Sequence, residues 1–217
     1  MQVKKHYGNP MIEQRSLFEG DAVCLMDPAG IICVSGVDRL TWLHSLLSQN
    51  LKNLIPGESS EALLLDPQGH IEQQIKIIDD GETTWLLVNK ENTQSLLDWL
   101  SKMIFRMKVE LTDRSADFVL VGATKPKPEL SVVSNSQPLV WQDGWPGVTP
   151  GGYRYSTREV NYKWFEHLVE ASKVDNVLGQ ASLAGTMAAD ALRVAAGRPL
   201  AASEIDEKSL PHELDLL

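Results

Sequence analysis

Two adjacent glutamines, Gln73 and Gln74, are of a type and position suited to binding a ligand. Around them, Ile71, Ile75 and Ile77 share one face of the strand that the alternation of apolar and polar residues predicts, and Gln73 falls on this apolar face. A glutamine amide donates and accepts hydrogen bonds, but it cannot shuttle a proton. Gln73 is therefore either a ligand contact or a polar residue that is satisfied at a sheet boundary.

Charged side chains at helical and turn spacing form a second group of candidates. Asp190 and Arg193 lie three residues apart in the apolar segment 181–196, which predicts an ion pair on one side of a helix. In so apolar a helix the pair would be partly buried, so it indicates a local structural network or the edge of a pocket. Asp66 begins the turn before Gly69, where an aspartate side chain commonly stabilises the turn backbone.

Aromatic residues in the Gly/Pro-rich segment 141–156 form a third group. Trp141, Trp145 and Tyr153 lie in this predicted loop, where exposed rings are suited to line a slot. The chain has no Gly-x-Gly-x-x-Gly or P-loop pattern, so nucleotide-hydrolysing and dinucleotide-dependent functions are not indicated.

The two cysteines, Cys24 and Cys33, are too few to supply a zinc or iron–sulfur ligand set within the chain. If residues 21–35 form a hairpin about Pro28, the two thiols face each other, and one interpretation is a redox-sensitive pair. The alternative is a pair of reduced cysteines buried in a core.

Composition limits the classes of partner. The formal net charge of −9 argues against binding nucleic acid through the general surface, because phosphate contacts need clustered Lys and Arg. No apolar run approaches the roughly 20 residues that cross a bilayer, and the N-terminal segment lacks the apolar stretch of a secretory signal. We therefore expect a cytoplasmic protein with no membrane or nucleic-acid partner.

The periodicity of apolar residues predicts antiparallel strands interrupted by helices. The predicted elements are a hairpin at 21–35, a helix at 35–51, a three-stranded meander at 61–89, a helix at 92–104, strands at 105–113 and 117–123, and helices at 163–171 and 181–196. Because no regular βαβ alternation occurs, the pattern indicates an α+β protein. The Pro- and Ser-rich segment 124–138 predicts a boundary between two α+β subdomains.

Three details of these elements are testable. Ser35 and Asp38 have the spacing of a capping box at the start of the first helix. Phe105 begins an alternation that points it inward in its strand. The segment 181–196 is apolar nearly all round and is followed by Gly197, so it predicts a buried helix that ends at this glycine.

Four stretches, taken together and in this order, resemble a known family. They are "GVDRLTWLHSLLSQNL", "LLLDPQGHIEQQIKIIDDG", "AGTMAADALRVAAGRPLAASEID" and "DEKSLPHELDLL". The set resembles the YgfZ branch of the glycine-cleavage T-protein superfamily, whose members are folate-binding proteins linked to iron–sulfur cluster repair. In that family the last stretch leads into a Lys-Gly-Cys-containing motif and a C-terminal β-barrel. The resemblance therefore implies that residues 1–217 are the N-terminal folate-binding region of a longer ancestor, cut before that motif.

The resemblance also assigns roles to individual residues. T-proteins carry an acid pair after the Gly69–Ile71 region, one member of which is held to be catalytic, and here the pair falls on Gln73 and Gln74. The family's Gly-x-x-Ala-x-acid-x-Leu-Arg helix matches through Asp190 and Arg193. Tetrahydrofolate would accordingly lie between the meander and this helix.

Further folate contacts follow from the same resemblance. Family members present acids toward the folate region from the stretch that contains Glu204 and Glu207, although solvated charge is the simpler explanation here. Asp66 and Tyr153 complete the set of expected contacts.

The resemblance implies a tetrahydrofolate-binding accessory protein that supports iron–sulfur cluster assembly or repair and has no catalytic residue. Its expected partners are folate and iron–sulfur proteins or their assembly factors. Two alternatives stay open: a tetrahydrofolate-dependent aminomethyltransferase of the glycine cleavage system, and a non-catalytic interaction fragment.

Overall fold

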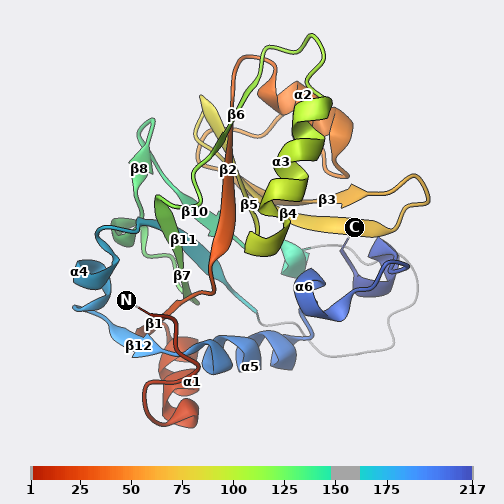
Figure 1. Ribbon diagram of the computed structural model, residues 1–217. Coiled ribbons are helices and arrows are strands. Elements are labelled where there is room, and N and C mark those ends of the chain that lie inside the picture. Colours follow the sequence, from red (N-terminus) through yellow and green to blue (C-terminus); the bar gives the residue numbers. More distant parts are fainter. Residues whose placement is uncertain (1, 148–161, 217) are drawn as a thin grey trace.

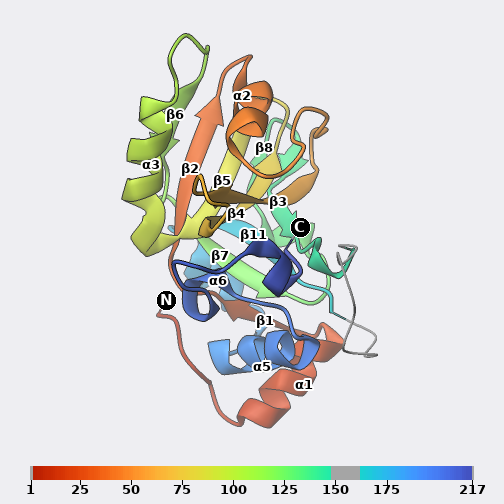
Figure 2. The same ribbon diagram turned by 90° about the vertical axis from the view of Figure 1, so that its right-hand side faces the viewer.

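The computed structural model describes residues 2–147 and 162–216. In this part of the chain two five-stranded sheets face each other, and helices cover their outer sides (Figures 1 and 2). We call the sheet with strand order β3-β4-β5-β2-β6 sheet I, and the sheet with order β10-β11-β7-β1-β12 sheet II. The fold is α+β, as the sequence predicts.

Sheet I contains the predicted meander. Its strands are β3 (Ser59–Leu65), β4 (Ile71–Asp79), β5 (Thr83–Asn89), β2 (Ala29–Ser35) and β6 (Glu110–Asp113), and every neighbouring pair is antiparallel. Helices α2 (Arg39–Leu46) and α3 (Thr93–Lys102) pack on one face, with the short helix η1 (Lys90–Asn92) before α3. Apolar residues of α3 at helical spacing, such as Leu96 and Leu100, are fully buried against this face and hold the helix there.

Sheet II is formed by short strands from distant parts of the chain. They are β10 (Val140–Gln142), β11 (Phe165–Glu170), β7 (Phe118–Ala123), β1 (Ala22–Leu25) and β12 (Ser182–Ala184), and only the β1–β12 pair is parallel. Helices α1 (Pro10–Glu19) and α5 (Thr186–Ala196) lie side by side below it in Figure 1, and α4 (Val174–Leu178) covers its other face.

The main core lies between the two sheets. It joins Trp85 of sheet I to Phe118 of sheet II in an edge-to-face contact with ring centroids 5.5 Å apart. Trp141 is also buried there, and its indole N–H donates to the carbonyl of Ser60 across the interface at 2.8 Å. Because these side chains are closely packed, the contacts fix the distance between the two sheets.

The last segments of the chain cross the open end of the two sheets. They contain α6 (Ala201–Glu204) and η4 (Pro211–Leu214). The backbone N–H of Ile71 donates to the carbonyl of Ser209, and Leu216 is buried against Leu63 and Ile71. The segment thus forms a wall beside β3 and β4 (Figure 2).

The segment 124–138 contains the helix η2 (Pro128–Leu130) and the small hairpin of β8 (Val133–Ser134) and β9 (Gln137–Pro138). The subdomain boundary in this segment stays a prediction. The short helix η3 (Trp145–Gly147) follows β10. Among the residues described, no helix has the length and apolar character to cross a membrane.

Two predicted elements are wrong in type. The segment 163–171 is not a helix, because Phe165–Glu170 is strand β11, paired with β7 and β10 inside sheet II. The predicted hairpin at 21–35 is also wrong, because β1 and β2 belong to different sheets. Both strands are buried on both faces, so their residues show no clear alternation that could reveal their partners.

Because β1 and β2 lie in different sheets, the expectation that the two cysteines face each other across a hairpin is also wrong. Cys24 pairs with Gly122 in sheet II and Cys33 with Trp85 in sheet I, so they are not cross-strand neighbours. Both are free and buried, and burial raises the pKa of each thiol to about 12.

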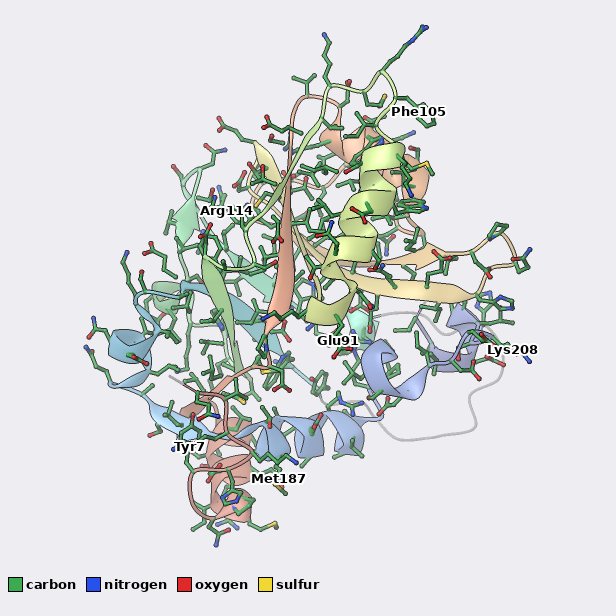
Figure 3. The ribbon with its side chains drawn as sticks, in the orientation of Figure 1. Tyr7, Glu91, Phe105, Arg114, Met187 and Lys208 are labelled. Atoms are coloured by element: carbon green, nitrogen blue, oxygen red, sulfur yellow. The ribbon has the colours of Figure 1, made fainter. Side chains whose placement is uncertain are left out.

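The first predicted helix is shorter than expected, and its capping box is absent. Ser35 ends β2, and the Asp38 side chain accepts from the backbone N–H of Lys108 instead of capping α2. Phe105 does not point inward: it has a φ of 46°, is 85% exposed, and lies beyond the end of α3 in Figure 3. A turn at this position, rather than a strand, connects α3 to β6.

Helix α5 ends where the sequence predicts. Gly197 has a φ of 75°, a left-handed conformation that glycine adopts without strain, and the N–H of Arg198 returns to the carbonyl of Arg193. The helix is not buried all round, however, because Met187 and Val194 are exposed on its outer side (Met187 is labelled in Figure 3).

Candidate functional site

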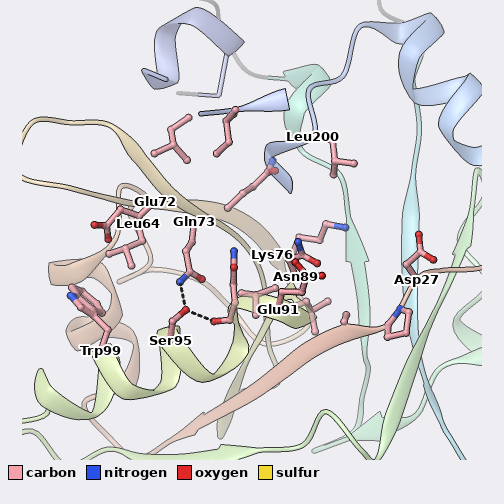
Figure 4. Close-up of a pocket in the computed structure, with 18 of the residues that line it drawn as sticks. Asp27, Leu64, Glu72, Gln73, Lys76, Asn89, Glu91, Ser95, Trp99 and Leu200 are labelled. Carbon is pink, nitrogen blue, oxygen red and sulfur yellow. Dashed lines mark hydrogen bonds between the residues drawn. The ribbon is translucent and has the colours of Figure 1, made fainter. Parts of the chain in front are cut away.

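A cavity of about 940 Å³ opens between β4 of sheet I, the start of β2, α3 and the last segments of the chain (Figure 4). Its lining mixes apolar and polar side chains: Met26, Asp27, Pro28, Ala29, Leu64, Asp66, His70, Ile71, Glu72, Gln73, Gln74, Lys76, Leu87, Val88, Asn89, Glu91, Asn92, Ser95, Trp99, Leu120, Glu166, Leu200, Ile205, Asp206 and Glu207. Its volume lies within the range of about 300–1,000 Å³ that is typical of small-molecule and cofactor sites.

Gln73 reaches this cavity from the middle of β4. It pairs with Leu64 next to a register shift between Leu64 and Leu65, and its side chain points toward Ser95 of α3 (Figure 4). The Gln73 Nε2 donates to Ser95 Oγ at 3.4 Å. The Gln73 Oε1 is buried and has no hydrogen-bond partner among the described residues, so it is an acceptor that a ligand donor would satisfy.

Gln74 faces the other side of the strand, and its Nε2 donates to Glu61 at 2.9 Å. Next to it, Lys76 forms an ion pair with Glu166 of β11, with Nζ and Oε1 2.6 Å apart. The ammonium also lies over the Trp141 ring, 4.7 Å from its centroid. Lys76 and Glu166 therefore connect the two sheets, and both line the cavity.

A smaller cavity of about 100 Å³ lies behind this ion pair and shares five lining residues with the large one. Its lining is Met26, Gln74, Lys76, Trp141, Asp143, Tyr162, Trp164, Glu166, Ala189, Arg193, Arg198, Pro199 and Leu200. Burial raises the pKa of Tyr162 well above its ordinary value, so its hydroxyl stays protonated.

Asp66 lies at the rim of the large cavity and forms the predicted turn. Its Oδ1 accepts from the backbone N–H groups of Gln68 and His70, and its Oδ2 lies 2.8 Å from the His70 ring. Desolvation opposes ionisation, but these hydrogen bonds outweigh it and hold the pKa of Asp66 below its ordinary value.

Three further predicted charged residues form a network outside the large cavity. Arg193 bonds to Asp190 at 3.4 Å and to Glu204 at 2.9 Å, and Asp190 is 63% exposed. Desolvation opposes ionisation of Glu204, but hydrogen bonds from Leu200 N–H and Arg193 lower its pKa. Arg193 lines the small cavity, whereas Asp190 and Glu204 are absent from the lining of both.

Trp141 and Trp145, two of the aromatic residues predicted to line one slot, belong to different apolar clusters. Trp141 is a buried core residue, and Trp145 packs against the segment that contains Ile205 and Leu214. Tyr153 lies outside the described residues. Glu207, from the same charged stretch as Glu204, lines the large cavity.

Arg198 is a buried residue that the sequence analysis does not single out. It bonds to Asp143 at 2.9 Å and to Glu61 at 2.5 Å, and it lies over the Trp145 ring. These two carboxylates outweigh the opposing effect of burial and raise its pKa. No sequence pattern indicates this role, because Glu61 and Asp143 are distant from Arg198 in the chain.

Comparisons with known proteins find sequence relatives that are named aminomethyltransferase. The chain is 26% identical over 204 residues to an aminomethyltransferase of Rippkaea orientalis, which covers 86% of this chain and 55% of that protein. It is 29% identical over 208 residues to the aminomethyltransferase of Geobacillus thermodenitrificans, with 86% and 56% covered. A comparison with models of protein families finds no match.

A solved structure shows the same fold. The glycine cleavage system aminomethyltransferase T from Bartonella henselae superposes with a TM-score of 0.69 at 18% identity, over 96% of this chain and 61% of that one. The chain is thus similar in sequence to aminomethyltransferases and in fold to a glycine cleavage system aminomethyltransferase. It spans about half the length of the curated relatives that it matches.

At the Gln73 position, the cavity is better suited to binding a ligand than to transferring a proton. Gln73 and Gln74 stand where the resemblance places an acid pair, and an amide cannot act as a general base. No group of three or more His, Cys, Asp or Glu side chains that could hold a metal ion occurs in the described ranges.

Proposed function

We propose that this chain binds tetrahydrofolate in the large cavity. The observation that carries the proposal is the unpaired Oε1 of Gln73 on the wall of a cavity of about 940 Å³. A pteridine ring is flat, apolar on its faces and rich in N–H donors at its edges. Leu64, Leu87 and Trp99 offer apolar surface for the faces, and the Gln73 oxygen offers an acceptor for an edge.

We propose, as the finer function, a cytoplasmic folate-binding accessory protein of the YgfZ type that supports iron–sulfur cluster assembly or repair. The support is the absence of an acid at Gln73 and Gln74, together with the resemblance of the four stretches. Its partners would be iron–sulfur proteins or their assembly factors.

Aminomethyl transfer from a carrier protein to tetrahydrofolate is the second candidate. It is favoured by the curated relatives, which are named aminomethyltransferase. Release of ammonia from an aminomethylated carrier protein in the presence of tetrahydrofolate distinguishes the two candidates: the accessory function predicts no release, and the transferase function predicts steady turnover.

Folate binding itself is tested by calorimetric titration of tetrahydrofolate into the chain. We expect saturable 1:1 binding, and Gln73→Leu should weaken it about five- to tenfold, because one hydrogen bond to the ligand is lost. Gln94→Leu is the matched control, since Gln94 is exposed on α3 and bonds to Asp98. No binding, or equal effects of the two substitutions, would contradict the proposal.

A further inference from the structure

The large cavity carries an excess of negative charge. Among the described residues, seven acidic side chains and one lysine line it, which leaves a formal excess of six negative charges with histidine counted as neutral. They are Asp27, Asp66, Glu72, Glu91, Glu166, Asp206, Glu207 and Lys76. The lysine is paired with Glu166, so the charge of the other acids is not balanced by a cation of the lining.

Most of this charge lies on side chains that are exposed to solvent. We call them the acidic rim; they are Asp27, Glu72, Glu91, Asp206 and Glu207. None of them has an ion pair with another residue of the described ranges. Figure 4 shows Glu72 and Asp27 on different sides of the cavity, so the negative charge is not confined to one wall.

The segment 148–161, outside the described residues, does not contain enough positive charge to change this sign. Its sequence has two arginines and one glutamate, a formal charge of +1 against the excess of six negative charges. The electrostatic potential at the rim is therefore negative.

Two buried acceptors indicate that this cavity takes a ligand and is not only an acidic surface. Gln73 Oε1 has no hydrogen-bond partner among the described residues, and the same holds for Glu166 Oε2, although the Glu166 side chain is only 2% exposed. Unpaired buried acceptors are costly, and the N–H groups of a ligand would remove that cost. The exposed rim then faces the part of the ligand that lies nearer to solvent.

We propose that the acidic rim selects tetrahydrofolate with a single glutamate over its polyglutamyl forms. This inference rests on the proposed folate binding and specifies which form is bound. The pterin ring is neutral and supplies the N–H donors, whereas the tail ends in carboxylates, and each further glutamate adds one negative charge. With the ring at the buried acceptors, the tail extends toward the rim, and every added carboxylate increases the repulsion.

The test compares calorimetric affinities for tetrahydrofolate with one glutamate and with three. In about 20 mM salt, we expect each added glutamate to weaken binding about threefold, so that the triglutamate binds about tenfold more weakly. In about 0.5 M salt, the two affinities should agree within about twofold, because salt screens the repulsion between exposed charges. A preference that is independent of salt would contradict the inference, since steric exclusion of the longer tail would then explain it.

A double variant tests whether the rim itself causes the preference. Glu72→Gln combined with Glu207→Gln should reduce the tenfold preference in about 20 mM salt to about fourfold. The matched control combines Glu19→Gln and Glu82→Gln, at the end of α1 and in the turn between β4 and β5, because these exposed acids line neither cavity. Both double variants change the net charge by the same amount, so the control should keep the wild-type preference.

The preference is a ratio measured within one variant, so a partly unfolded sample does not alter it. Equal wild-type affinities in low salt, tighter binding of the triglutamate, or equal effects of the two double variants would overturn the inference and leave folate binding standing. Failure of both ligands to bind would refute the proposed function, and the inference with it.

Discussion

At the scale of single residues, buried polar side chains in this molecule have specific hydrogen-bond partners. His167 is fully buried, and its two ring nitrogens both have partners: Nδ1 lies 2.9 Å from the carbonyl of Val121, and Nε2 accepts from the N–H of Lys127. This pairing fits a neutral ring that donates from Nδ1. Burial accordingly lowers the pKa of His167 below its ordinary value of 6.5, against the opposing hydrogen bond to Val121.

The first prediction concerns the pH dependence that His167 confers. The unfolded chain takes up a proton at this residue below pH 6.5, whereas the folded chain resists it, so stability should fall as pH decreases from about 6.5 toward the lower folded pKa. His167→Gln should lower stability at pH 7.5 and flatten this dependence between pH 7.5 and 5.5. Thermal unfolding followed by circular dichroism measures both effects. His212→Gln, at an exposed site, should retain the wild-type slope; an unchanged slope in His167→Gln would refute the assignment.

At the scale of elements, the segment after α5 is held in place by one buried cation. Arg198 connects it to Glu61 of β3 and to Asp143 after β10. Because the segment supplies Leu200, Ile205 and further residues to the large cavity, this connection determines whether that wall of the cavity forms.

The second prediction is that Arg198→Met destabilises the protein by about 3–5 kcal/mol, since two buried carboxylates lose their partner. Urea unfolding gives the free energy, and limited proteolysis should show faster cleavage within 198–216. Arg106→Met, at an exposed position, should change neither quantity measurably. An Arg198→Met protein as stable as Arg106→Met would show that the ion pairs do not hold this segment.

The elements also show where sequence patterns succeed and fail. The meander of β3, β4 and β5 was predictable because turn residues at Asp66–Gly69 and Asp79–Glu82 separate strands that alternate. Strand β11 was mistaken for a helix because it is buried on both faces, so it shows no period of two. Because of this error, the ion pair between Glu166 and Lys76 could not be predicted from the sequence. It forms only because the two sheets pack face to face.

At the scale of the whole molecule, residues of the two sheets, of α3 and of the segment 200–207 line the large cavity. The sequence places Gln73 on an inward face, and the structure brings it to the cavity wall. It could not place Arg198 or Lys76, because their partners are distant in sequence and only the packed sheets bring them together. Asp190 and Arg193 form the local pair that their spacing predicts, and neither lines the large cavity.

Hydrogen exchange with and without saturating tetrahydrofolate tests the central claim, that a reduced folate occupies the large cavity. We predict slower exchange at 66–71 and 200–207, which border the cavity, and no change in α4, which packs on the far face of sheet II. Unchanged exchange at both cavity segments, or protection confined to α4 and its surroundings, would contradict the account.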